Sequence, residues 1–113
     1  MDLEIKKYLF DILESIDSIE KYLGDKLDFK KYASDKMLRR AIEREFEIIG
    51  EAMMQLDNIS PQTAEQISQH RSIIGFRHVL VHGYSNLDPN TVWNVVETKI
   101  STLLEQAKKL LRD

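Results

Sequence analysis

The fold is decided by residues 35–58, DKMLRRAIEREFEIIGEAMMQLDN. Apolar side chains recur there every three or four residues, with charged residues between them, at Leu38, Ile42, Phe46, Ile49, Met53 and Leu56. This spacing places the apolar side chains on one face of an α-helix. Ser34 or Asp35 can cap the start of the helix, and we expect it to end near Asp57 and Asn58. The chain therefore contains at least one long amphipathic helix.

The residues before this stretch predict a second long helix and a loop. The same spacing appears at Ile5, Leu9, Ile12, Ile16, Ile19 and Leu23. This helix should end near Gly24, because glycine is common just beyond a helix C-terminus. Residues 25–35 break the periodicity. We interpret them as a connecting loop whose apolar residues Leu27, Phe29 and Tyr32 pack onto the core.

Three further helices are predicted after residue 58. Ser60-Pro61 and Asp88-Pro89 are each typical of a helix cap followed by a proline at the first helical position. The first pair predicts a short helix over roughly 61–69, and the second starts the last helix. That last helix carries Val92, Val96, Ile100, Leu103, Ala107 and Leu110 on one face. Between them, residues 71–82 have an apolar centre and should form a helix that ends at Gly83.

Four principal helices and one short helix, joined by short connections, favour an all-α, up-down four-helix bundle. The length of 113 residues predicts a single domain, residues 1–113. The chain has no cysteine, which excludes disulfides, thiolate nucleophiles and cysteine-ligated zinc. No apolar run approaches the roughly 20 residues that a membrane helix needs. The start, MDLEIKKYLF, lacks the apolar stretch of a signal peptide, so we expect a cytoplasmic protein.

The charge balance limits how the chain could bind nucleic acid. There are 16 Lys and Arg against 19 Asp and Glu, a formal net charge of −3. This argues against binding RNA or DNA through overall positive charge, although a local basic site remains compatible with it. Any such site should show strong salt dependence.

All three histidines fall in one segment, between residues 70 and 82. His82 lies at the predicted end of a helix, where the helix dipole favours a protonated imidazole suited to general acid–base chemistry. It could equally be a helix cap that contacts a terminal carbonyl. Arg77 could clamp a phosphate through its guanidinium group or form a surface ion pair. The two residues lie about 140° apart on an ideal helix, so one helix does not bring them together.

Other polar residues have both a chemical and a structural interpretation. His78 and His82 are one turn apart, a spacing that can present two imidazoles to a metal, but the same helix contains no Asp or Glu as a third ligand. His78 could instead be a second proton carrier or a surface residue, and His70 is expected to be structural. We expect no metal and no other cofactor, and a helical metal-binding protein that uses His78 and His82 is the alternative that a metal assay would test.

The long helix over 35–58 also carries candidate supporting residues. Arg44 and Glu47 should form a solvated ion pair. If their face turned toward Arg77 and His82, Arg44 would add positive potential and Glu47 could orient an arginine or histidine. Gly50 costs helix stability relative to alanine, which is explained if another helix approaches closely there.

The run from Arg77 to Tyr84, RHVLVHGY, has the form R-x4-H-x-Y. It resembles the signature of HepT-type toxins in the HEPN superfamily of ribonucleases. The similarity extends to Phe10-Asp11-Ile12-Leu13, Glu47-Ile48-Ile49-Gly50-Glu51-Ala52, Ile74-Gly75-Phe76-Arg77, and Asp88 with Trp93. These matches occur in the same order over nearly the whole chain, and such an ordered set is specific.

The resemblance implies a helical homodimer in which the R-x4-H segments of two protomers share one active site. It implies a metal-independent endoribonuclease, with Arg77 and His82 as catalytic residues, as the toxin of a type II HEPN/MNT toxin–antitoxin system. It also implies an MNT-type nucleotidyltransferase antitoxin that transfers AMP to Tyr84 and so inactivates the toxin. The alternative is a non-catalytic helical dimer that serves as a docking or substrate-recognition module for a nucleotidyltransferase.

Overall fold

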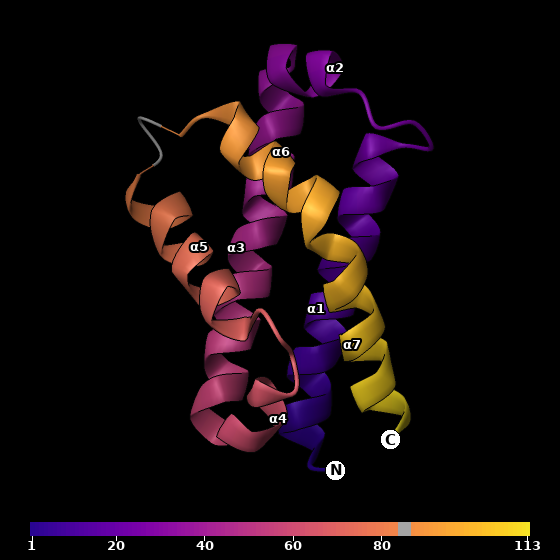
Figure 1. Ribbon diagram of the computed structural model, residues 1–113, viewed down its shortest axis with the longest axis vertical. Helices are drawn as coiled ribbons and strands as arrows, with labels where there is room; N and C mark the ends of the chain where they lie inside the picture. Colours follow the sequence, from indigo (N-terminus) through magenta and orange to yellow (C-terminus); the bar gives the residue numbers. More distant parts are fainter. Residues whose placement is uncertain (84–86) are drawn as a thin grey trace.

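The computed structural model describes residues 1–83 and 87–113, and this part of the chain contains seven helices and no strand (Figure 1). The helices are α1 (Leu3–Leu23), α2 (Phe29–Ser34), α3 (Lys36–Ile59), α4 (Pro61–Glu65), α5 (His70–His82), α6 (Pro89–Thr98) and α7 (Ile100–Arg112). The all-α prediction is confirmed. Within the described residues, no helix is both long enough and apolar enough to cross a membrane.

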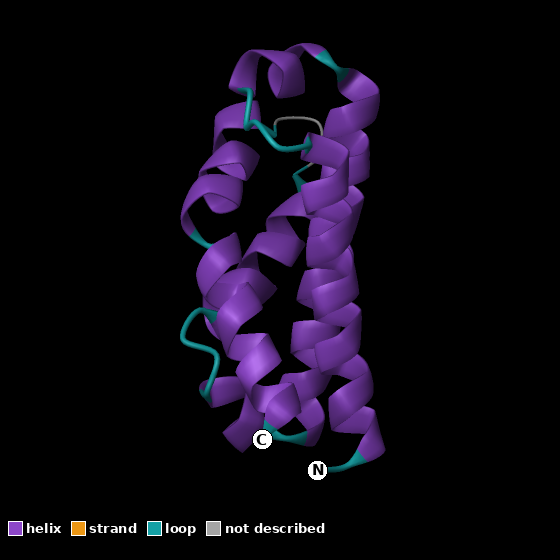
Figure 2. Cartoon of the chain, turned by 90° about the vertical axis from the view of Figure 1, so that its right-hand side faces the viewer, coloured by secondary structure: helices purple, strands orange, loops and turns teal. Residues whose placement is uncertain are grey.

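The principal helices run alternately up and down along an elongated bundle (Figures 1 and 2). The two long helices α1 and α3 pack against each other. Helix α7 packs on α1, and α5 packs on α3. The α6–α7 segment supplies the fourth principal helix, so both chain termini lie at the same end of the bundle. The predicted bundle is confirmed, with additional short helices.

Aspartate side chains cap the N-termini of several of these helices, as the sequence predicted at Asp88 and, as the alternative to Ser34, at Asp35. The Asp35 carboxylate accepts a hydrogen bond from the Leu38 N–H at 3.0 Å, and Asp88 accepts one from the Asn90 N–H at 2.9 Å. Each contact satisfies an N–H that the first helical turn would otherwise leave without a partner. Just after the C-terminal end of α1, Gly24 has a φ of 76°, a left-handed conformation that favours glycine.

The interpretation of residues 25–35 as a loop is wrong in part, because Phe29–Ser34 form α2. This helix spans six residues, too few to show a helical periodicity in the sequence. It forms because Tyr32 is fully buried and packs on Trp93 of α6, with ring centroids 5.3 Å apart. Phe29 contacts the same indole at 5.7 Å. Leu27 remains exposed, contrary to the prediction.

The last predicted helix is also interrupted, at Lys99 between α6 and α7. The Thr98 hydroxyl donates a hydrogen bond to the Asn94 carbonyl at 2.6 Å, a side-chain contact that commonly bends helices. The predicted apolar face is nevertheless buried along both halves. Helix α4 likewise ends at Glu65, several residues before the predicted boundary.

Candidate functional site

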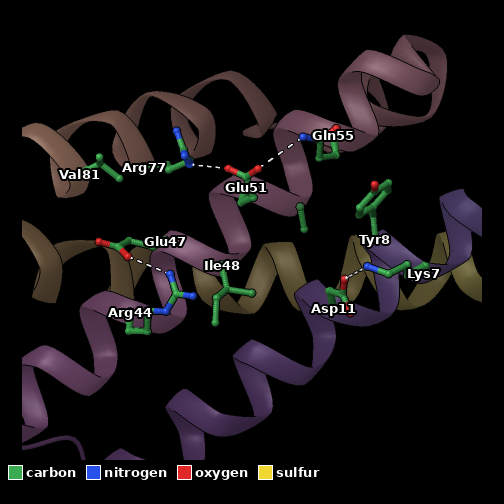
Figure 3. A pocket seen from close by; sticks show the side chains of 11 residues that line it. Lys7, Tyr8, Asp11, Arg44, Glu47, Ile48, Glu51, Gln55, Arg77 and Val81 are labelled. Atoms are coloured by element: carbon green, nitrogen blue, oxygen red, sulfur yellow. Dashed lines mark hydrogen bonds and ion pairs between the residues drawn. The ribbon is translucent and has the colours of Figure 1, made fainter.

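An open cleft of about 680 Å³ lies between α1, α3 and α5 (Figure 3). Its charged lining residues are Lys7, Asp11, Arg44, Glu47, Glu51 and Arg77. Three of these are basic and three are acidic, so the lining has no net formal charge. A phosphate group that enters the cleft therefore meets as many carboxylates as cations.

Arg77 lies on the α5 wall of the cleft and forms an ion pair with Glu51 of α3. Its Nε lies 2.9 Å from Glu51 Oε2, and the two side chains are 29% and 46% exposed. Among residues 1–83 and 87–113 this is the one ion pair between helices, since the other pairs join residues three or four positions apart in one helix. The contact is an ion pair at Nε, and the other two guanidinium nitrogens, Nη1 and Nη2, carry four of the five N–H donors of an arginine.

Gly50 explains why α5 approaches α3 so closely beside Arg77. A Cβ atom built on Gly50 would lie 2.3 Å from Arg77 Cβ and 3.3 Å from the Ile73 carbonyl oxygen. Real Cβ atoms do not approach other atoms as closely as the first distance. The close helix approach that the sequence suggested at Gly50 is thus present, and it occurs at the motif arginine.

Arg44 and Glu47 line the same cleft but pair with each other. Arg44 Nη1 lies 3.1 Å from Glu47 Oε2, as expected for charges three residues apart on a helix. Glu47 is therefore not the residue that contacts Arg77; Glu51, one turn further along α3, makes that contact. Sequence reasoning did not select Glu51, although it follows Gly50 directly and shares the helix face of Glu47.

His82 is the last residue of α5, as predicted, and its side chain is exposed. Its ring centroid lies 4.4 Å from that of His78, and neither histidine lines the cleft. The structure thus does not bring His82 and Arg77 together within one chain. No cluster of three or more histidine, aspartate or glutamate side chains suited to hold a metal ion occurs in the described ranges.

The third histidine of the segment, His70, does not line the cleft. His70 is buried, with Nδ1 3.1 Å from the Ile67 carbonyl oxygen, which agrees with a structural role. Tyr84, the predicted site of AMP transfer, lies outside the described residues.

Comparison with known proteins extends the similarity beyond the motif. The ribonuclease HepT-like family model matches residues 12–110. The chain is 28% identical to a protein of Methanocaldococcus jannaschii over 93% of this chain and 94% of that protein. It is 32% identical to a protein of Thermococcus cleftensis over the same shares of the two chains. Both relatives bear names of candidate ribonucleases, the second that of a ribonuclease HepT.

No solved structure gives a significant match to this chain. The family model covers most of the chain, including the R-x4-H-x-Y run, both walls of the cleft formed by α3 and α5, and most of the other helices. The chain therefore belongs to the ribonuclease HepT-like family.

Proposed function

We propose that this protein is a metal-independent endoribonuclease, the toxin of a HEPN/MNT toxin–antitoxin pair, and that Arg77 and His82 are its catalytic residues. The observation that carries the proposal is the position of both residues on α5, with Arg77 on a cleft wall and His82 exposed at the helix end. Family membership and the names of the relatives support it.

The reaction needs only the groups that these side chains supply. One imidazole removes the proton from an RNA 2′-OH, and the 2′-oxygen forms a bond to the adjacent phosphorus. The bond from phosphorus to the 5′-oxygen breaks, and a second, protonated imidazole donates a proton to that oxygen. Arg77 stabilises the negative charge that develops on the phosphate oxygens. The products are a 2′,3′-cyclic phosphate and a 5′-hydroxyl end.

A homodimer supplies the second histidine and the second arginine. Val79 and Val81 on α5 are 44% and 37% exposed, next to His78 and His82. Burial of these valines against a second copy would bring the two His82 side chains toward a shared cleft. We assign supporting roles to His78 as an additional imidazole and to Arg44 as a second cation, whose charge Glu47 balances.

Tyr84 is the proposed site of regulation by an MNT-type nucleotidyltransferase. It lies two residues after His82 in the chain. An AMP group on its hydroxyl adds bulk and a negative phosphate close to the basic groups that would bind RNA. Incubation with the partner and ATP should add the mass of AMP to Tyr84 and abolish RNA cleavage. Full activity of the modified protein would contradict this regulation.

The deciding experiment is cleavage of total cellular RNA by the purified protein in the presence of a chelator. The wild type should cut and leave 2′,3′-cyclic phosphate ends, whereas His82→Ala should not cut. His78→Ala, tested in parallel, shows whether the neighbouring imidazole contributes. If the wild type with unmodified Tyr84 leaves RNA intact, the protein is instead a docking module for a nucleotidyltransferase.

A further inference from the structure

The side chain of Arg77 is held at both ends by consecutive residues of α3. At its base, Gly50 leaves just enough room for Arg77 Cβ and Cγ to pack against the α3 backbone. At its far end, Nε pairs with Glu51. A long arginine side chain on a helix surface normally samples many rotamers, and fixing it costs conformational entropy. Here the fold fixes it before any ligand binds.

Glu51 is itself held in place. Its Oε2 faces Arg77, and its Oε1 accepts a hydrogen bond from Gln55 Nε2 at 3.4 Å. Figure 3 shows this chain of contacts, with Gln55 and Glu51 on α3 and Arg77 opposite them on α5. The three side chains all line the cleft. The carboxylate therefore has a defined orientation from which it can orient the guanidinium.

The geometry of the pair suits phosphate binding. Because Glu51 contacts Nε, the donors on Nη1 and Nη2 are not used by this ion pair. Those two groups form the fork that binds two phosphate oxygens at once. Catalysis is sensitive to such positioning, since a displacement of about 1 Å can lower a rate by about 100-fold.

We infer that Glu51 is a positioning residue of the active site, which holds Arg77 so that Nη1 and Nη2 face the scissile phosphate. This inference rests on the proposed ribonuclease function. The effect acts on the rate of the chemical step more than on RNA affinity, because removal of a carboxylate from the cleft also removes a repulsive charge.

The test compares Glu51→Ala with Glu45→Ala. Glu45 lies on the same helix and makes a contact between helices, since it accepts a hydrogen bond from the Tyr22 hydroxyl at 3.0 Å. Both variants thus lose one negative charge and one interhelical contact, but Glu45 does not line the cleft. On a defined RNA oligonucleotide, Glu51→Ala should lower kcat by about 10- to 100-fold with KM unchanged or lower. Glu45→Ala should leave both constants near those of the wild type.

Two further measurements separate positioning from general structural damage. Glu51→Gln retains an oxygen at the position that contacts Arg77 Nε, so it should recover part of the lost kcat. The NMR signal of the Arg77 Nε–H group, identified by its loss in Arg77→Lys, should shift in Glu51→Ala and not in Glu45→Ala. Both readouts depend on contact with Arg77.

The possible failures are distinguishable. If the wild type cleaves RNA and Glu51→Ala has the same kcat as Glu45→Ala, the positioning role is overturned while the ribonuclease function stands. A rise in KM at unchanged kcat would overturn it too, because it would assign Glu51 to RNA binding. If the wild type does not cleave RNA, the proposed function and this inference fall together.

Discussion

Substitution of Gly50 by alanine tests how α3 and α5 fit together at the candidate site. The new methyl group would lie 2.3 Å from Arg77 Cβ, whereas ordinary contacts begin near 3.4 Å. The helices must therefore separate by roughly 1 Å, because Cβ is attached to the backbone and cannot rotate away. Such overpacking costs about 1–3 kcal/mol, partly offset by the gain of about 0.5–1 kcal/mol from replacing a helical glycine.

The two terms together leave a net loss of up to about 2.5 kcal/mol, and we expect Gly50→Ala to be less stable than the wild type by about 1 kcal/mol. The same displacement should lower the rate of RNA cleavage by about 100-fold, since it moves Arg77 relative to α3. Urea unfolding followed by circular dichroism gives the free energy of unfolding, and initial rates on a defined RNA give the activity.

Gly75→Ala is the matched control, because a Cβ on Gly75 meets no atom within 4 Å. Alanine there should stabilise α5 by about 0.5–1 kcal/mol. If Gly50→Ala also unfolds at the wild-type urea concentration or above it, the close packing of Gly50 against Arg77 does not constrain the site, and the reasoning is refuted.

Three other perturbations address the core, the dimer and a helix cap. Tyr32→Phe should raise the free energy of unfolding by about 1 kcal/mol, because the buried Tyr32 hydroxyl has no hydrogen-bond partner in the described part of the chain. Burial also raises the pKa of Tyr32, because the charged phenolate is disfavoured there. Above the unfolded-state pKa of about 10 the unfolded chain loses this proton more readily than the folded chain, so the free energy of unfolding falls as the pH rises. Urea unfolding at neutral and alkaline pH should show this loss in the wild type and a smaller one in Tyr32→Phe. Val79→Glu should convert the proposed dimer to a monomer without RNA cleavage, as measured by light scattering and activity, whereas Phe10→Glu, at an exposed position on α1, should remain dimeric and active. A wild type that is monomeric at micromolar concentration would contradict the dimer. Asp88→Ala removes the cap contact to the Asn90 N–H and should cost about 1 kcal/mol in urea unfolding, and an unchanged midpoint would show that this cap contributes nothing.

The sequence predicted the principal helices because their signals are local. Apolar spacing along α1, α3 and the α6–α7 segment, with caps such as Asp35, depends on residues a few positions apart. Short elements lacked such a signal. Helix α2 forms because Tyr32 and Phe29 pack on Trp93, about 60 residues away in the chain, and periodicity cannot report a contact at that distance.

The candidate site was likewise predictable from the sequence only in its local features. The sequence alone determined that Arg77 and His82 share one helix, about 140° apart, and that the chain resembles HepT-type proteins. Only the tertiary structure decided that Arg77 faces a cleft and pairs with Glu51, while His82 lies outside that cleft. The physical reason is that contacts between α3 and α5 depend on how the two helices pack in space, and the spacing of residues along one helix does not report this. The helices come close at Gly50, where the absence of a side chain leaves room for Arg77.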